Sequence, residues 1–105
     1  LLKRAVAIVE KNMDNIEFST DEFAREMNMS RSNLHLKLKA ITGESTIDFI
    51  RKIRFNEAAK LLKDGRYTIA EVSTMVGFNT PSYFATSFKK YFGCLPTEYI
   101  KKIKG

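Results

Sequence analysis

The sequence predicts an all-α fold in which two similar helical lobes flank one long central helix. Apolar residues along the chain recur at three- and four-residue steps, which is the spacing of one helix face. The stretches on the two sides of the centre also repeat the same residue types at a nearly constant offset. With 105 residues, the chain has room for one domain or for two very small lobes. We assign residues 1–44 to the first lobe, 45–65 to the linker helix and 66–105 to the second lobe.

The first lobe begins with a scaffold helix and continues with a capped helical hairpin. A helix over residues 2–13 would bury the stripe Leu2, Ala5, Val6, Val9 and Met13. Ser19 and Glu22 have the spacing of a capping box, in which each side chain binds the backbone N–H of the other residue. Phe18 and Phe23 flank this box as a hydrophobic staple.

The second lobe repeats this hairpin. The capping box returns 49 residues later as Thr68 and Glu71, and the turn residues Asn28 and Gly77, which both tolerate positive φ, share the same offset. After one inserted residue the offset becomes 50, which aligns Ser32 with Ser82, Leu34 with Phe84, Leu38 with Phe88, Lys39 with Lys89 and Gly43 with Gly93. Each copy is therefore predicted to be a helix-turn-helix, a motif whose second helix can enter the DNA major groove.

The central helix is predicted over residues 45–65. Either Ser45 or Thr46 can cap its start, and Gly65 can end it in a left-handed conformation. Its predicted apolar stripe is Ile47, Ile50, Ile53, Ala58, Leu61 and Leu62. After the second hairpin, proline at a first helical position predicts a last short helix from Pro96 on, with Tyr99, Ile100 or Ile103 packing on the second lobe.

The distribution of charge favours a nucleic-acid partner. The net charge is +6, and residues 45–105 carry eleven basic and five acidic side chains, against seven of each in residues 1–44. Residues 29–40 and 79–93, which hold the second helix of each hairpin, contain no Asp or Glu. A helix that faces phosphates requires this, because a carboxylate would be repelled by the DNA backbone.

Helical geometry separates a core face from an outward face on each second helix. Leu34, Leu38 and Ile41 would form the first core face, and Phe84, Phe88 and Tyr91 the second. The residues opposite the core are Ser32, Leu36 and Lys39, with His35 beside them, and then Ser82, Thr86 and Lys89, with Ala85 beside them. These outward stripes are small or basic, as a helix deep in a groove needs.

Each of the notable residues on these outward stripes could contact DNA or could simply be an ordinary side chain exposed to solvent. Leu36 either meets thymine methyl groups or is merely an exposed leucine, and His35 either binds a base edge or phosphate or is solvated. No Cys, His or carboxylate stands at ligand spacing near His35, so a metal site is not expected. Arg31 suits a phosphate better than a base, and Lys89 with Lys90 suits either phosphate or solvent.

The second hairpin and its tail, GFNTPSYFATSFKKYFGCLPTEYIKK, resemble the signature region of AraC/XylS-type bacterial transcription regulators. The first hairpin, DEFAREMNMSRSNLHLKLKAITG, and the central FIRKIRFNEAAKLL are also similar to that family. The resemblance implies seven helices, two helix-turn-helix lobes and no enzymatic activity. It places base-reading positions on Ser32, His35 and Leu36 and on Pro81, Ser82 and Thr86. Many members have arginine where this chain has Leu36, Thr86 and Ile100, so their site preference does not carry over.

We therefore predict sequence-specific binding of double-stranded DNA for transcription regulation, without a cofactor. The predicted DNA-binding residues are Arg31, Ser32, His35, Leu36, Lys39, Thr80, Pro81, Ser82, Thr86, Lys89 and Lys90. The alternative is a helical protein-interaction module that contacts RNA polymerase or a signalling partner, and an activator would do both. No paired carboxylates, activated nucleophile or Gly-rich phosphate loop supports an enzyme.

The setting of the domain is also predicted. The stretch MSRSNLHLKLKAITGES resembles the C-terminal domains of hybrid two-component sensor regulators, and a chain that starts at Leu1 fits a piece of a longer protein. Dimerisation is then expected outside these residues. The single cysteine, Cys94, fits a reducing compartment, so we expect a cytoplasmic bacterial protein with no membrane contact.

Overall fold

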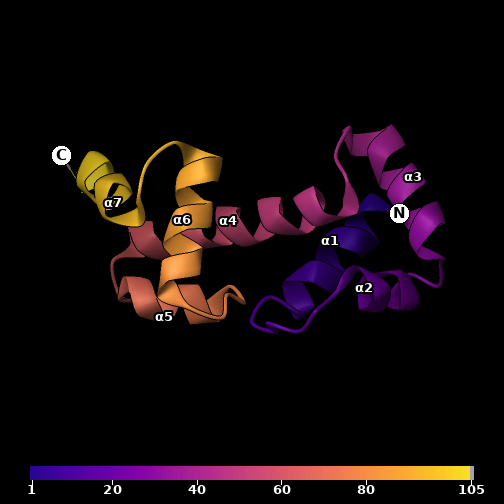
Figure 1. Ribbon diagram of the computed structural model, residues 1–105, viewed down its shortest axis with the longest axis horizontal. Coiled ribbons are helices and arrows are strands. Elements are labelled where there is room, and N and C mark those ends of the chain that lie inside the picture. Colours follow the sequence, from indigo (N-terminus) through magenta and orange to yellow (C-terminus); the bar gives the residue numbers. More distant parts are fainter. Residues whose placement is uncertain (105) are drawn as a thin grey trace.

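The computed structural model describes residues 1–104 and is all-α, as predicted. These residues form seven helices: α1 (Leu2–Lys11), α2 (Thr20–Glu26), α3 (Arg31–Thr42), α4 (Thr46–Asp64), α5 (Ile69–Met75), α6 (Pro81–Phe92) and α7 (Pro96–Lys104). Helix α4 runs along the long axis, with α1–α3 at one end and α5–α7 at the other (Figure 1). The molecule measures 43 × 23 × 21 Å. Within the described residues, none of the helices has the length and apolar character needed to cross a membrane.

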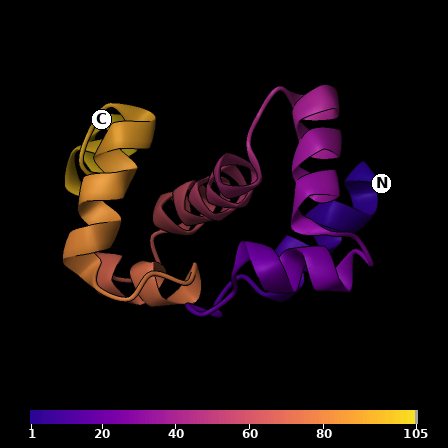
Figure 2. The same cartoon turned by 45° about the vertical axis from the view of Figure 1, so that its right-hand side comes forward.

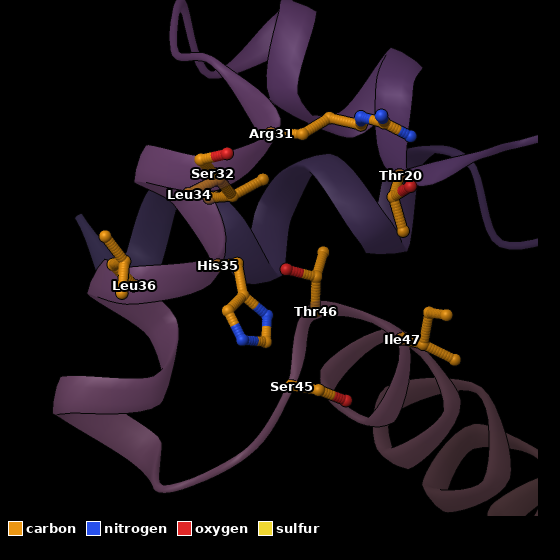
Figure 3. A pocket seen from close by; sticks show the side chains of 9 residues that line it. All are labelled: Thr20, Arg31, Ser32, Leu34, His35, Leu36, Ser45, Thr46 and Ile47. Carbon is orange, nitrogen blue, oxygen red and sulfur yellow. The ribbon is translucent and has the colours of Figure 1, made fainter.

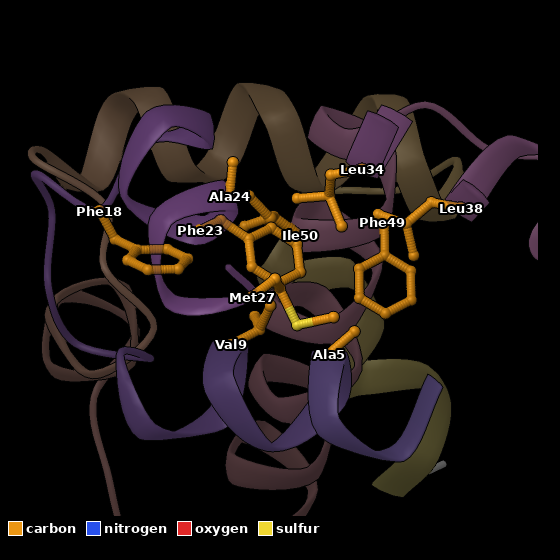
Figure 4. Packing of buried hydrophobic residues seen from close by; sticks show 10 residues of the cluster. All are labelled: Ala5, Val9, Phe18, Phe23, Ala24, Met27, Leu34, Leu38, Phe49 and Ile50. Atoms are coloured by element: carbon orange, nitrogen blue, oxygen red, sulfur yellow. The ribbon is translucent and has the colours of Figure 1, made fainter. Parts of the chain in front are cut away.

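Each end of α4 supports its own hydrophobic core. The core of the first lobe, drawn in Figure 4, consists of Ala5, Val9, Phe18, Phe23, Ala24, Met27, Leu34, Leu38, Phe49 and Ile50. The core of the second lobe consists of Phe55, Ala58, Leu62, Val72, Val76, Phe78, Phe84 and Phe88. Helix α4 is thus the one element that contributes buried residues to both cores.

Most of the predicted helix signals are confirmed. Ser45 is the N-cap of α4, since its hydroxyl accepts from the N–H of Asp48 at 3.2 Å, and left-handed Gly65 ends the helix. The turn residues Asn28 and Gly77 have φ of 58° and 82°. Phe18 and Phe23 are in contact, with ring centroids 5.8 Å apart.

The predicted capping box is complete in the second lobe only. Thr68 accepts from the N–H of Glu71 at 3.1 Å, and the Glu71 carboxylate accepts from the N–H of Thr68 at 2.9 Å. In the first lobe Ser19 accepts from the N–H of Glu22 at 3.2 Å, and within the described residues no return bond from Glu22 is present. The prediction of a reciprocal box at Ser19 was therefore half wrong.

Four apolar positions predicted to face a core differ from the structure. Leu2, Ile41 and Ile47 are 40%, 52% and 52% exposed, because each lies in the first or last turn of its helix, where fewer neighbouring residues can cover it. Tyr91 is also exposed, although its ring stacks on Phe55 at 5.0 Å.

The first and the central helix also differ from their predictions. Helix α1 ends at Lys11 rather than at Met13, and the Met13 side chain instead packs against the core of the second lobe. On α4 the predicted single stripe missed Phe49, Arg54 and Phe55, which are all buried. A helix that serves two lobes buries two faces, which a one-stripe pattern does not represent.

The helix-turn-helix arrangement places α3 and α6 upright on the two sides of α4 (Figure 2). Both turns have matching backbone bonds. The N–H of Met29 donates to the Ala24 carbonyl at 2.9 Å, and the N–H of Phe78 donates to the Ser73 carbonyl at the same distance. The sequence repeat is therefore a repeat of structure, with equivalent second helices at opposite ends of the molecule.

Candidate nucleic-acid interface

Helix α3 presents a polar, exposed face away from the first core. Ser30 caps the helix by accepting from the N–H of Asn33 at 3.1 Å, while Leu34 and Leu38 are fully buried. The predicted residues on the other face, Ser32, His35, Leu36 and Lys39, are all exposed. Leu36 is 64% exposed, the largest value among the exposed large apolar side chains of the described residues.

Helix α6 repeats this arrangement in the second lobe. Thr80 caps it by accepting from the N–H of Tyr83 at 3.1 Å, Pro81 occupies the first turn, and Phe84 and Phe88 are fully buried. All the predicted α6 residues are exposed: Thr80, Pro81, Ser82, Thr86, Lys89 and Lys90. The Thr86 hydroxyl donates to the Ser82 carbonyl at 3.0 Å. Its proton is thus used within the helix, and toward a base Thr86 offers its methyl group and an acceptor oxygen.

The acid-free stretch of the first lobe is not acid-free in three dimensions. The Arg31 Nε lies 3.0 Å from an Asp21 carboxylate oxygen, and both side chains are more than half exposed. Asp21 belongs to the first turn of α2, so helix packing brings this acid to the start of α3. An exposed ion pair of this kind is weak, and a phosphate that engages Arg31 would replace Asp21.

A cavity of about 550 Å³ lies between α3 and the start of α4 (Figure 3). It is lined by Thr20, Arg31, Ser32, Leu34, His35, Leu36, Ser45, Thr46 and Ile47, among which there is no carboxylate. The His35 ring points toward Ser45 and Thr46, whereas Leu36 also lines the cavity but extends away from these two residues (Figure 3). The N-terminus of α4 adds the partial positive charge of a helix start to this cavity. Sequence reasoning missed Thr20, Thr46 and Ile47 because they come from other elements.

A second cavity of about 510 Å³ separates α4 from α6 and distinguishes the two adjacent lysines. Lys90 lines it together with Arg51 and the acids Glu44 and Asp48. Lys89, in contrast, is exposed and does not line this cavity. Lys89 therefore belongs to the outward stripe with Ser82 and Thr86, whereas Lys90 lies toward the acidic side of α4.

Two capped helices with exposed, small or basic faces, held at the ends of one linker helix, define a double helix-turn-helix DNA-binding domain. Residues 23–102 match the family model of a helix-turn-helix domain. The chain belongs to the AraC-type helix-turn-helix family of transcription regulators. This family and fold are those of DNA-binding regulators rather than of enzymes.

Individual relatives agree with this assignment. Histidine kinase P4 of Formosa agariphila is 41% identical over 99 residues, which cover 94% of this chain and 7% of that protein. The Msm operon regulatory protein of Streptococcus mutans is 33% identical over 84 residues, which cover 80% of this chain and 30% of that protein. The chain thus spans less than a third of the length of either relative.

The fold also matches a solved domain closely. The C-terminal domain of AraT, a response regulator from Geobacillus stearothermophilus, superposes with a TM-score of 0.88 at 32% identity. The match covers 96% of this chain and 84% of that chain.

Proposed function

We propose that the domain binds one face of a DNA duplex by inserting α3 and α6 into successive major-groove segments. The observation that carries this proposal is the pair of equivalent helices upright on the two sides of α4 (Figure 2). Helix α4 has 19 residues and is about 28 Å long, whereas successive groove segments are about 34 Å apart. Because the molecule is 43 Å long, lobes that extend beyond the ends of α4 can span this distance on straight DNA.

The exposed residues divide into two groups by chemistry. We infer that base edges are contacted by Ser32, His35 and Leu36 on α3 and by Pro81, Ser82 and Thr86 on α6. The proposed phosphate contacts are Arg31, Lys39, Thr80 and Lys89. Lys90 is a weaker candidate for a phosphate contact, because it lines the cavity that also holds Glu44 and Asp48. No arginine projects from the middle of either outward stripe, so bidentate guanine readout there is replaced by hydroxyl, imidazole and methyl contacts.

The whole protein is proposed to be a cytoplasmic sensor regulator in which this domain is the output. The 41% identity to part of a histidine kinase supports this setting, as does the likeness to the C-terminal domain of a response regulator. Phosphorylation of a receiver region would then control DNA occupancy, and dimerisation would reside in other regions. An activator of this design would also contact RNA polymerase.

The salt dependence of binding tests the proposal. If the domain neutralises roughly six phosphates, log K should fall with log salt with a slope of about −5 on duplex DNA. The first step is to select binding sites from random duplexes, and the second is to titrate salt on a selected site and on a scrambled duplex. Lys89→Gln should make the slope less steep by about one on both duplexes. Lys60→Gln, which changes an exposed lysine of α4 that is not a proposed DNA contact, should leave the slope unchanged. Failure to enrich any duplex would favour a protein-interaction module.

A further inference from the structure

Arg54 is a buried cation at the junction of the two lobes. It lies near the middle of α4 and is 9% exposed. No carboxylate oxygen of the described residues lies within 4.0 Å of its guanidinium nitrogens. Burial lowers the pKa of Arg54 from its ordinary value, but an arginine remains protonated in proteins. A charged group is thus kept from water without a counter-ion, which costs free energy unless its donors are satisfied.

Two donors of Arg54 bind backbone carbonyls, one from each lobe, whereas its buried Nε has no hydrogen-bond partner among the described residues. Nη2 donates to the carbonyl of Asn15, in the loop between α1 and α2, at 2.9 Å. Nη1 donates to the carbonyl of Gly77, in the turn between α5 and α6, at 3.3 Å. The guanidinium therefore joins one point of the first lobe to one point of the second, through bonds that its charge strengthens.

Gly77 shows how closely the lobes meet at this point. A Cβ added to Gly77 would lie 2.6 Å from the carbonyl oxygen of Met13 and 2.9 Å from Cζ of Arg54. Met13 also packs its side chain against the core of the second lobe. The turn of the second lobe is thus in contact with both the first-lobe backbone and the guanidinium.

The equivalent turn of the first lobe has no such role. Asn28 occupies the position that matches Gly77, with φ of 58°, and its side chain is exposed. The two turns otherwise have matching backbone bonds, from Met29 N–H to the Ala24 carbonyl and from Phe78 N–H to the Ser73 carbonyl. Arg54 therefore breaks the internal symmetry, and it does so at the place that decides how the lobes are oriented.

We propose that Arg54 is a positioning residue that fixes the distance and angle between α3 and α6, and so selects the spacing of the two half-sites. This inference rests on the proposed two-helix mode of DNA binding. When the two lobes are held rigidly and the half-sites have the matching spacing, binding of the first lobe makes binding of the second effectively intramolecular and raises the overall affinity. When the spacing does not match, the second lobe adds little affinity. Without Arg54, each lobe keeps its own core, but the two reading helices move relative to each other.

The first test measures lobe geometry without DNA. Nitroxide labels are placed by Lys37→Cys on α3 and Lys101→Cys on α7, in a chain with Cys94→Ala, and pulsed EPR gives the distance distribution. The native Arg54 should give one narrow distribution, and Arg54→Met a broader one with unchanged helix content. Lys60→Met, which removes an exposed cation from the same helix, is the control and should stay narrow. A broad distribution in the presence of Arg54, or an unchanged one in Arg54→Met, overturns the proposal.

Stability separates positioning from a merely structural role. Arg54→Met removes the cost of a buried, unpaired charge but leaves the carbonyls of Asn15 and Gly77 without this donor, so the two effects on stability oppose each other. Arg54→Met is thus expected to retain its melting temperature while the distance distribution broadens.

If Arg54→Met does not fold, Arg54→Lys takes its place. A lysine ammonium is a point charge rather than a planar fork, so it should hold one carbonyl and give a distribution of intermediate width, and a native width would overturn the proposal.

The second test uses DNA with two selected half-sites. A change of the spacing by about two base pairs should weaken binding of the native chain by roughly tenfold or more, and of Arg54→Met by much less. The native chain and Arg54→Met should bind a duplex with a single half-site with the same affinity. Equal tolerance of spacing in both chains overturns the role of Arg54 while DNA binding stands. If neither chain binds any duplex, the proposed function fails, and the EPR result alone decides the role of Arg54.

Discussion

Leu36 is a large apolar side chain that is unusually exposed to solvent. It projects from α3 on the side opposite the first core and is 64% exposed. Its neighbours Ser32, His35 and Lys39 are polar, so it does not extend a hydrophobic patch on that helix. An apolar side chain in such a place gains free energy only when a partner covers it, and thymine methyl groups are the apolar features of the major groove.

Leu36→Ala should therefore weaken binding of a selected site by roughly threefold to tenfold, since about one or two buried methyl equivalents are lost. The loss should disappear when one particular thymine in the site is replaced by uracil, which lacks the methyl group. Ile41→Ala is a matched control and should leave binding unchanged, because Ile41 is 52% exposed on the same helix but is not among the residues proposed to contact DNA. Fluorescence anisotropy on the two duplexes measures these differences. Equal losses on both duplexes would mean that Leu36 does not read the methyl group.

At the scale of elements, the two hairpins offer a comparison of caps in equivalent positions. Helices α2 and α5 each have seven residues, so neither is stable by itself, and capping matters to both. The Thr68 cap has the reciprocal bond from Glu71, and the Ser19 cap has only its own. Thr68→Ala removes the hydroxyl that accepts from the N–H of Glu71. Because the first turn of α5 then becomes less ordered, the bond from the N–H of residue 68 to the Glu71 carboxylate should also weaken.

We expect Ser19→Ala to lower the free energy of unfolding by about 1 kcal/mol and Thr68→Ala by more, toward about 2 kcal/mol. For a chain of this size, about 1 kcal/mol corresponds to a fall of roughly 4–8 °C in melting temperature. Glu71→Gln, which keeps an acceptor, should have a smaller effect than Thr68→Ala. Thermal unfolding followed by circular dichroism gives the order, and an equal effect of the two cap substitutions would contradict it.

At the scale of the whole molecule, the two lobes meet where the turn between α5 and α6, at Gly77, contacts the loop between α1 and α2, at Met13. Gly43 and Gly77 both have positive φ, at 78° and 82°. A Cβ on Gly43 would meet nothing within 4 Å, whereas one on Gly77 would meet a first-lobe carbonyl and the Arg54 guanidinium. Replacing glycine by alanine at position 43 therefore introduces backbone strain alone. At position 77 it introduces the same strain and also a clash between the two lobes.

Gly43→Ala should cost about 1 kcal/mol of stability, and Gly77→Ala about 3 kcal/mol or more, because the added methyl group also displaces the first-lobe backbone. Urea unfolding of the two variants measures this difference. The pulsed EPR distances should also shift in Gly77→Ala and stay unchanged in Gly43→Ala. Similar stability losses in the two variants would show that the lobes separate at little cost.

The seven helices, most of their ends and the outward faces of α3 and α6 are all predictable from the amino-acid sequence. These features depend on local interactions: a hydroxyl within three residues of an N–H, a residue that tolerates positive φ, and apolar spacing along one helix. The 49- to 50-residue repeat supplied the pairing of lobes, because equivalent residues carry out equivalent local roles. The residues predicted to bind DNA are all exposed, although Lys90 lies toward the acidic side of α4 and not on the outward face of α6.

Which elements are in contact with each other could not be predicted from the sequence and is known from the fold. The fold brought Asp21 to Arg31 across 10 positions of sequence, left Ile41 and Ile47 uncovered beside small cores, and moved Met13 onto the other lobe. It also made Arg54, which reads as one more cation on a helix, the buried link between Asn15 and Gly77. These outcomes depend on contacts between residues far apart in the sequence, 39 positions in the case of Arg54 and Asn15, and neither periodicity nor local propensity contains that information.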